Sequence, residues 1–374
     1  MKVLYSCLSK SWGGLEMFTL TSIQQLLKRN ISVELLCSED SRIHIEANNM
    51  GIMLHPVKAN GYFHPITTFK TSLLIRNNTY SLVHTQASKD LWLLVPALFL
   101  ANSQAPIFLT KQVGSSIIKR DFLHNQLYKR ISKIFAISTA IKNNVLQTTP
   151  VEKQDVIIMP NGIDIKKFNP DTIDSKKIRS EYNISQDEIV IGMLARFTPG
   201  KGHEELLWAA KELNKEFNKL RYIIVGEPSR GESDYAEKIK GLANDYKLDN
   251  VLFTGFRSDV PEVLAALDIF AFPSHSEAFG IALVEAMAMK KPSVCSNAEG
   301  ILDIAINDST SYLFENKNAE DLKNKLKLLI NSSETRLKFG ENSRKRVLNN
   351  FDIELLNDKM VKIYSEAIGE IEEQ

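Results

Sequence analysis

The sequence predicts an α/β protein built from two doubly wound, Rossmann-like domains of similar size. Short apolar runs rich in Val, Ile and Leu alternate with helix-length stretches along the whole chain. Apolar strands that alternate with helices indicate parallel sheets covered on both faces. The length of 374 residues agrees with about two domains. We therefore expect the two domains to face each other across a cleft, where such sheets bind ligands.

The strands are expected at regular intervals in each half. Seven in the first half lie near residues 2–7, 31–37, 52–57, 81–86, 106–110, 133–138 and 155–159. Helical stretches separate most of them, for example Leu15–Arg29 and Thr139–Gln147. The second half repeats the scheme with six strands, near 189–194, 221–225, 250–253, 268–272, 292–296 and 311–314.

Turn-forming and polar residues mark a boundary between the halves, from Asn161 to Asp171. We expect an N-terminal domain over residues 1–165 and a C-terminal domain over residues 166–350. The last segment, 351–374, has the pattern of an amphipathic helix. We expect this helix to pack back on the first domain.

The composition is that of a soluble globular protein, with 44% hydrophobic and 24% charged residues. Cys7, Cys37 and Cys295 lie in apolar runs without metal-ligand spacing, which favours buried thiols in a reducing compartment. The chain starts directly with a strand, without the apolar segment of a secretory signal. The longest apolar run, Leu91–Ala101, is too short to cross a bilayer. We expect a cytoplasmic protein.

The charge is unevenly distributed along the chain. Residues 1–170 carry 19 Lys/Arg and 10 Asp/Glu, a balance of +9, and the remainder carries 27 and 35, a balance of −8. This asymmetry predicts an anionic acceptor or a peripheral contact with the inner face of an anionic membrane. A solvated basic face without a partner is the alternative. The basic residues include Lys119, Arg120, Lys129, Arg130 and Lys133.

Two carboxylates and a glycine surround one expected helix start. Glu277 precedes the helix, Gly280 lies at its start, and Glu285 lies two turns into it. A helix N-terminus with free amides and a positive dipole end binds anions. Acids beside such a site suit the neutral hydroxyls of a ribose or sugar attached to a phosphate. Two acids that only stabilise the helix dipole, by about 0.3–1 kcal/mol each, are the alternative.

The same helix supplies further candidate contacts. We expect it to begin near Phe279, so that the amides of Gly280 and Ile281 point at the anion. The segment therefore predicts one wall of a nucleotide-sugar site.

A second cluster follows the expected strand at 189–194. Arg196 lies at the strand end, and Lys201 follows in a loop that contains Pro199, Gly200 and Gly202. Arg forms a fork to phosphate oxygens, and Lys supplies a mobile point charge. The pair therefore predicts a site that neutralises a diphosphate without a metal. A surface ion-pair loop is the alternative.

Three smaller signals also follow expected strands. Gly13 and Gly14 open a helix that carries Glu16, and paired glycines let a phosphate or sugar approach the backbone. Gly226 ends another strand, and Phe256 follows the next, where it is a candidate to border a base. Each of these is equally compatible with an ordinary strand-to-helix turn.

Taken in order, the motifs resemble those of the retaining glycosyltransferases of family four, which have the GT-B fold. The resemblance covers residues 2–350. It rests on Gly-Gly-Leu-Glu, Asn-Gly-Ile-Asp, Arg-Phe with Lys-Gly, Val-Gly-Glu, Phe-Thr-Gly and two glutamates eight positions apart.

The resemblance implies roles for the matching residues. Arg196 and Lys201 would bind the donor diphosphate as it leaves, and Glu277 would contact hydroxyls of the transferred sugar. Glu285 would hold the ribose hydroxyls. The remaining donor-binding candidates are Gly13, Gly14, Gly226, Phe256, Phe279, Gly280 and Ile281. The candidates on the acceptor or sugar side are Glu16, His84 and Gln112.

One position departs from the family pattern. Many relatives carry a histidine after the strand near 106–110, where this chain has Gln112. Glutamine hydrogen-bonds a sugar hydroxyl but does not titrate. His84, at the end of another strand, is a candidate substitute. A buried strand-end histidine is the alternative.

The resemblance implies a hexosyltransferase of polysaccharide or lipopolysaccharide biosynthesis. It would move a sugar from a nucleoside diphosphate sugar to a hydroxyl of a glycan or glycolipid, with retained anomeric configuration. It would need no metal or other cofactor, and no nucleic acid partner is expected. Two alternatives remain open: a nucleotide-sugar epimerase or sugar-phosphate synthase of the same fold, and a catalytically silent nucleotide-sugar-binding module.

Overall fold

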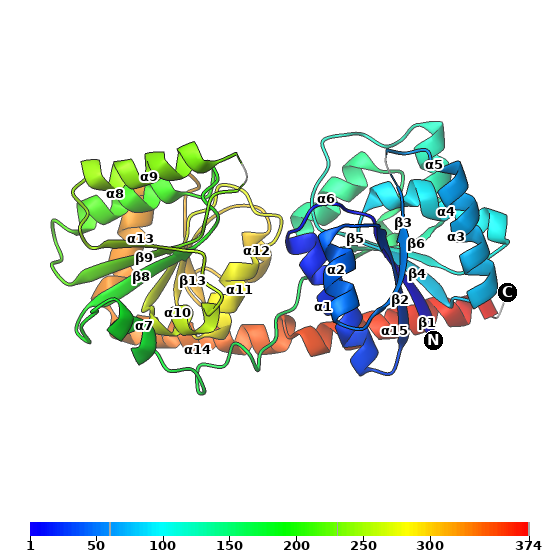
Figure 1. The fold of residues 1–374 in the computed structure, drawn as a ribbon. Helices are drawn as coiled ribbons and strands as arrows, with labels where there is room; N and C mark the ends of the chain where they lie inside the picture. Colours follow the sequence, from blue (N-terminus) through cyan, green and yellow to red (C-terminus); the bar gives the residue numbers. More distant parts are fainter. Residues whose placement is uncertain (60, 230, 373–374) are drawn as a thin grey trace. The chain divides into compact units, whose positions relative to one another are not determined.

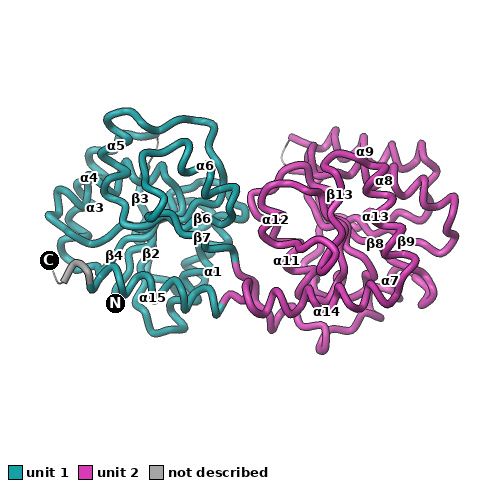
Figure 2. Tube along the Cα trace, turned by 180° about the vertical axis from the view of Figure 1, so that it is seen from behind, with its two compact units in different colours: residues 1–161, 354–374 teal, residues 162–353 magenta. Residues whose placement is uncertain are grey.

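The computed structural model describes residues 1–59, 61–229 and 231–372, and it divides into two compact units (Figures 1 and 2). The first unit comprises Met1–Asn161 and the C-terminal segment from Glu354, and the second comprises Gly162–Ile353. The division thus falls after Asn161, where the sequence pattern placed it after residue 165. Residues 373–374 of the expected C-terminal helix lie outside the described residues.

The first unit contains a seven-stranded parallel sheet in the order β3-β2-β1-β4-β5-β6-β7. The strands are rich in Val, Ile, Leu and Phe, and most of their side chains are buried, as parallel sheets require. The chain order reverses between β1 and β4. The strands are β1 (Lys2–Cys7), β2 (Ser32–Ser38), β3 (Met53–Val57), β4 (Leu82–Thr85), β5 (Ile107–Lys111), β6 (Ile131–Ala136) and β7 (Val156–Ile158).

Seven α-helices belong to the described part of the first unit (Figure 1). One apolar core lies between the sheet and α1, α2 and α15. The C-terminal helix contributes Leu356, Met360 and Tyr364 to this core. The helices are α1 (Gly14–Lys28), α2 (Arg42–Asn49), α3 (Pro65–Asn78), α4 (Leu91–Ala101), α5 (Phe122–Tyr128), α6 (Thr139–Thr148) and α15 (Ile353–Glu372).

The second unit contains a six-stranded parallel sheet in the order β10-β9-β8-β11-β12-β13. Its chain order reverses between β8 and β11. At such a reversal the loops leave the two strands in opposite directions and open a crevice at the carboxyl ends. The strands are β8 (Ile189–Leu194), β9 (Leu220–Val225), β10 (Val251–Gly255), β11 (Ile269–Phe272), β12 (Ser293–Ser296) and β13 (Ser311–Phe314).

The helices of the second unit enclose a core of their own. Buried side chains of α8, α9 and α13 pack against the sheet, and Phe339 of α14 joins them. The helices are α7 (Lys176–Glu181), α8 (His203–Leu213), α9 (Ser233–Asp245), α10 (Val260–Ala266), α11 (Ile281–Ala288), α12 (Ile301–Ile304), α13 (Ala319–Asn331) and α14 (Ser333–Asn350).

The predicted fold class is confirmed. Every expected strand is present, with ends that differ by no more than two residues. The three cysteines are buried free thiols. Among the described residues, no helix is both long enough and apolar enough to cross a membrane.

Candidate active site

The reversal point of the second sheet brings two predicted clusters together. β8 and β11 are neighbours, so the loops that follow them start side by side. The backbone amide of His275 donates to the carbonyl of Gly200 at 2.8 Å. The Nζ of Lys201 lies 2.6 Å from Oε1 of Glu277. Residues 76 positions apart in the chain therefore form one surface.

Lys201 forms an ion pair, as the alternative of an ion-pair loop allowed, and its partner is Glu277 of the other cluster. Their side chains are 22% and 17% exposed, so both remain accessible from solvent. An ammonium group has three N–H donors. One of them serves Glu277, which leaves donors for phosphate oxygens without breaking the pair.

Arg196 is exposed at the end of β8, and its Nη1 donates to the hydroxyl of Ser229 at 3.0 Å. This bond comes from the loop after β9 and orients the guanidinium, whose other N–H groups remain open to a ligand. Among the described residues, no group of three or more His, Cys, Asp or Glu side chains is arranged to hold a metal ion. Arg196 and Lys201 are the predicted cations that the structure places at this edge.

Helix α11 begins at Ile281, two residues later than expected. Gly280 precedes it with a φ of 115°, a backbone conformation that favours glycine, and a Cβ there would approach the ring of Phe272 to 3.1 Å. The amides of Leu283 and Val284 donate to the carbonyl of Gly280 at 3.0 and 3.3 Å, so Ile281 and Ala282 supply the free amides at the start of the helix. Ile281 itself is 40% exposed.

Phe279 is a core residue, which corrects its expected role as a donor contact. Its side chain is 4% exposed, and its ring packs edge-on against Phe351 with centroids 5.9 Å apart. Burial of this aromatic side chain stabilises the second unit. The ring of Phe279 is therefore part of the core and does not face the donor site.

Glu285 is a half-buried carboxylate in the second turn of α11. Burial raises the pKa of Glu285 to about 7, and the charge of Lys167 opposes the rise. Within the described part of the chain, this carboxylate has no hydrogen-bond partner. A desolvated carboxylate without hydrogen-bond donors is energetically unfavourable, and hydroxyl groups of a ligand would supply those donors.

Gly226 and Phe256 have different surroundings. Gly226 has a φ of 147°, and a Cβ there would lie 1.9 Å from the carbonyl oxygen of Ala195. Close approach of two backbone segments therefore explains this glycine without a ligand. Phe256 is 70% exposed after β10, so its ring is free to contact a ligand.

In the first unit, Gly13 and Gly14 lie at the start of α1, directly after the loop that follows β1. A Cβ at Gly14 would meet no atom within 4 Å, and one at Gly13 would meet only Oε2 of Glu16, at 3.7 Å. The packing of this unit therefore does not require either glycine. Glu16 is 4% exposed in the first turn of the helix.

His84 lies inside the first unit and is fully buried, which argues against its expected place beside a substrate. Its Nδ1 is hydrogen-bonded to the hydroxyl of Tyr364, and its Nε2 lies 2.8 Å from Oγ1 of Thr110. Burial lowers the pKa of His84 to about 3, so the ring is neutral. It ties α15 to the sheet.

Gln112 lies just beyond β5 and is 8% exposed. Its Oε1 accepts a hydrogen bond from Nδ2 of Asn161 at 3.0 Å. Its Nε2 is buried and has no partner among the described residues. The Nε2 of Gln112 is therefore an N–H donor without an acceptor, and a sugar hydroxyl or a phosphate oxygen would be a suitable acceptor.

Asp90, a buried carboxylate at the reversal point of the first sheet, was not among the predicted site residues. Its Oδ2 accepts hydrogen bonds from Oγ of Ser6 at 2.9 Å, the amide of Leu8 at 3.2 Å and Oγ1 of Thr85 at 3.1 Å. These bonds tie the ends of β1 and β4 together. An aspartate directly before the apolar stretch 91–101 was the signal that could have revealed it.

Lys111, the last residue of β5, was not among the predicted site residues either. Its side chain is 8% exposed, and burial together with the nearby charge of Lys119 lowers the pKa of Lys111 to about 8. Lys119 donates to the hydroxyl of Ser88 at 3.1 Å. In the described residues neither lysine has a carboxylate partner.

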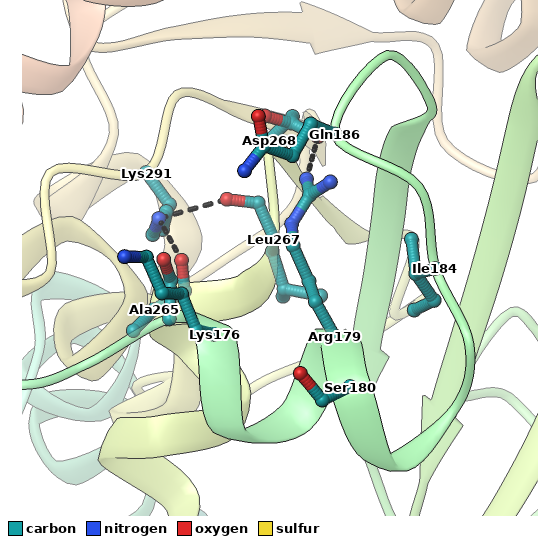
Figure 3. Close-up of a pocket in the computed structure, with 10 residues that line it drawn as sticks. Lys176, Arg179, Ser180, Ile184, Gln186, Ala265, Leu267, Asp268 and Lys291 are labelled. Atoms are coloured by element: carbon teal, nitrogen blue, oxygen red, sulfur yellow. Dashed lines mark hydrogen bonds and ion pairs between the residues drawn. The ribbon is translucent and has the colours of Figure 1, made fainter.

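A pocket of about 560 Å³ lies elsewhere in the second unit, at the amino ends of β8 and β11 (Figure 3). Nη2 of Arg179 donates to Asp268 at 2.7 Å, and Nζ of Lys291 donates to the carbonyls of Ala265 and Leu267 at 2.8 Å each. These charged groups already have partners, and ligands of such sheets bind at the opposite edge. We assign the pocket a structural role.

Two family models match the chain. The model of Glycosyl transferases group 1 matches residues 174–346, and that of Glycosyltransferase Family 4 matches residues 12–167. The two matches fall in different units and follow one another along the chain. The chain belongs to glycosyltransferase family four. Its two Rossmann-like units are those of the GT-B fold.

Similar proteins are known in several bacteria. The capsular polysaccharide biosynthesis glycosyltransferase CapM of Staphylococcus aureus is 24% identical over 367 residues, which cover 94% of each chain. The N,N'-diacetylbacillosaminyl-diphospho-undecaprenol alpha-1,3-N-acetylgalactosaminyltransferase of Campylobacter jejuni is 26% identical and covers 81% of this chain and 78% of its own. This family four chain is therefore similar to glycosyltransferases of polysaccharide and glycolipid synthesis.

Solved structures show the same fold. A glycosyltransferase from Rickettsia africae superposes with a TM-score of 0.87 at 22% identity and covers 98% of both chains. HepE of Anabaena, in complex with UDP, superposes with a TM-score of 0.85 at 22% identity, covering 98% of this chain and 100% of its own. Both are GT-B proteins in architecture.

Proposed function

We propose that this family four glycosyltransferase moves a sugar from a nucleoside diphosphate sugar to a hydroxyl of a glycan or glycolipid, with retained anomeric configuration. It would use no metal and no other cofactor. The observation that carries the proposal is the edge formed by Arg196, Lys201 and the N-terminus of α11 at the β8–β11 reversal. These groups are cations and free amides, which a departing diphosphate requires.

The proposed step breaks the bond between the anomeric carbon and the diphosphate oxygen. The acceptor oxygen bonds to the same face of that carbon, and its proton passes to the departing phosphate oxygen. Negative charge therefore grows on the diphosphate, where Arg196, Lys201 and the first amides of α11 would stabilise it. Donors held in place before the reaction act most strongly on such developing charge.

The two glutamates would orient the donor, and neither would act as a nucleophile. Glu277 is already held by Lys201 at 2.6 Å, so a diphosphate on Lys201 would bring the attached sugar near Glu277. Glu285 has no donor of its own among the described residues, and the two ribose hydroxyls would supply them. The exposed ring of Phe256 is the proposed contact for the base.

In the first unit, we propose that the open backbone at Gly13 and Gly14 meets substrate. The packing of the unit leaves space there that a side chain would fill, so a ligand best accounts for glycine at both positions. Glu16 and the free amide donor of Gln112 would hydrogen-bond hydroxyls on this side.

The acceptor is proposed to carry an anionic group. Lys111 and Lys119 have no carboxylate partner in the described residues, and a phosphate or diphosphate would supply the missing anion. The relative from Campylobacter jejuni is named for a diphospho-undecaprenol acceptor. A lipid-linked acceptor would bring this chain to the inner face of a membrane, in agreement with the +9 balance of residues 1–170.

Donor turnover tests the proposal. We expect Arg196→Ala and Lys201→Ala each to lower the rate of donor sugar release about 10²–10³-fold, because each removes one donor to the developing charge. Lys345→Ala, which removes an exposed lysine of α14, is the matched control and should keep the wild-type rate. UDP-glucose and other nucleotide sugars are screened first by thermal shift.

The alternatives predict other results. A silent binding module would show thermal shifts without release of sugar from any donor. An epimerase would change the donor sugar in the absence of an acceptor. Wild-type turnover in both the Arg196 and Lys201 variants would contradict their leaving-group role.

A further inference from the structure

We propose that the first unit docks on an anionic membrane through one surface, which we call the docking surface. It consists of the exposed side chains of residues 62–73, 89, 99–100 and 113–130, which lie on α3 and just before it, just before α4 and at its end, and on the segment through α5. The inference rests on the proposed function, because a lipid-linked acceptor is held in a membrane. It adds the surface of the enzyme that meets the lipid.

Exposed hydrophobic side chains are concentrated on this surface. Of the 27 large hydrophobic side chains exposed in the described part of the chain, 12 lie between residues 62 and 123. Soluble proteins rarely expose apolar groups in such a cluster unless the cluster binds something. Four of the five exposed phenylalanines belong to it, namely Phe63, Phe69, Phe99 and Phe122.

The helices that carry these side chains lie side by side (Figures 1 and 2). The ring of Tyr62, just before α3, packs edge-on against Trp92 of α4 at 5.7 Å, and Trp92 packs edge-on against His124 of α5 at 5.4 Å. Arg76, near the end of α3, donates to the carbonyl of Leu100 at 2.7 Å. These contacts join α3, α4 and α5, which carry or adjoin most of the exposed groups, into one region of the first unit.

The charge of the same region identifies an anionic partner. Residues 62–130 carry eight Lys/Arg and two Asp/Glu, a balance of +6. Asp90 and Lys111 are buried, so Asp121 is the one acid and seven of the eight Lys/Arg are the cations that reach solvent in this segment of described residues. Lys70, Arg120 and Lys129 are exposed. Aromatic and aliphatic side chains mixed with cations, almost without acids, are typical of protein surfaces that enter anionic lipid headgroups.

A groove of about 860 Å³ between α4 and α5 strengthens this assignment. Its walls are mainly apolar and include Trp92, Phe99 and Leu123, while Lys129 and Arg130 also line it. An apolar groove beside two cations suits a lipid chain with an anionic headgroup. A protein partner would need acidic and apolar groups in matching positions, whereas an anionic bilayer offers both everywhere on its surface.

Sedimentation with vesicles tests the docking surface in the full chain. We expect binding to vesicles of phosphatidylglycerol and phosphatidylcholine, at least tenfold weaker binding to phosphatidylcholine alone, and release by about 0.5 M salt. The triple variant F63S/F99S/F122S should bind the anionic vesicles at least tenfold more weakly. These side chains are 85%, 84% and 75% exposed, so their loss should leave the thermal unfolding temperature unchanged.

A charge variant and a control complete the test. R120S/K129S should weaken anionic binding and reduce its dependence on salt. The control L337S/K338S removes an exposed leucine and lysine from α14 in the second unit and should bind as the wild type does. Equal binding by the triple variant and the control would overturn the proposal. So would wild-type protein that forms a dimer through this surface and ignores vesicles.

Donor turnover, measured without vesicles, separates this inference from the proposed function. The docking variants should keep the wild-type rate of sugar release. Vesicle binding without any donor turnover would overturn the proposed function and leave the docking surface standing. Donor turnover without vesicle binding would overturn the docking surface and leave the proposed function standing.

Discussion

The ion pair between Lys201 and Glu277 links two residues to which the family resemblance gives separate substrate contacts. In the structure, the two charges neutralise each other at 2.6 Å. Neutralisation limits the electrostatic cost of holding a lysine and an acid in a site that awaits an anion. The ammonium group of Lys201 would contact both the diphosphate and Glu277. The position of the diphosphate would therefore fix where Glu277 meets the sugar.

Glu277→Gln separates these two contacts. We expect UDP without a sugar to bind at least as tightly as in the wild type, because Lys201 then offers all of its donors to phosphate. Turnover of the nucleotide sugar should fall about 10²-fold or more, because the amide hydrogen-bonds sugar hydroxyls more weakly than a carboxylate. Calorimetric titration with UDP and a turnover assay measure the two effects. Loss of UDP binding equal to the loss of turnover would contradict the assignment.

Glu285→Gln tests whether the half-buried carboxylate is kept for function at the expense of stability. The pKa of Glu285 is raised from 4.5 to about 7, so the folded state binds its proton more tightly than the unfolded state does. Stability is therefore lost as pH rises from about 4.5 to 7, by up to about 3 kcal/mol. The glutamine variant should melt at a higher temperature than the wild type at about pH 8 and equally at about pH 4.5, and it should bind donor more weakly.

The two outcomes of that experiment are independent. A variant with unchanged donor affinity would remove Glu285 from the site, even if the melting temperatures behave as expected. Equal melting temperatures under the alkaline condition would instead show that the carboxylate is not desolvated in solution.

Helix α15 shows how an element distant in sequence completes a unit. Tyr364 of this helix is fully buried in the core of the first unit and is hydrogen-bonded to His84 of β4. Amphipathic periodicity identifies the helix, but the apolar face it must cover is assembled only when the sheet forms. The local sequence of α15 therefore does not predict that the helix packs on β4.

His84→Gln tests this attachment through its pH dependence. The pKa of His84 is lowered from 6.5 to about 3, so the unfolded state binds the proton more tightly. Wild-type stability is therefore lost as pH falls below about 6.5, by about 1.4 kcal/mol per pH unit. Glutamine keeps hydrogen-bonding groups and does not titrate, so the variant should lose less stability between about pH 6.5 and 4.5. Chemical denaturation at each pH measures the difference, and parallel curves would contradict the assignment.

At the scale of the whole molecule, each unit has a separate apolar core. The chain passes between the units after Asn161 and again after Ile353. Because burial of apolar surface is the main stabilising contribution, damage to one core should affect mainly one unit.

Tyr364→Ala and Phe339→Ala test whether damage to one core affects mainly its own unit. Each removes a buried aromatic side chain, from the first and second core respectively, at a cost of about 3–5 kcal/mol. In calorimetry, each variant should lower a different unfolding transition. UDP at about 100 times its dissociation constant should add about 2.7 kcal/mol to the transition lowered by Phe339→Ala. A single transition lowered equally by both would contradict separate cores.

The fold class and four of the candidate site residues could be predicted from the sequence. Apolar strands alternating with helices predicted both sheets, because strands buried on both faces are nearly continuous apolar runs. Arg196, Lys201, Glu277 and Glu285 stood out because cations, glycines and acids clustered at strand ends are typical of sites that bind phosphates and hydroxyls. Only the tertiary structure showed that Phe279 turns into the core, that His84 is buried under α15 and that Lys201 pairs with Glu277. Those facts depend on contacts between residues distant in the chain, and local sequence does not encode which neighbours a side chain will meet.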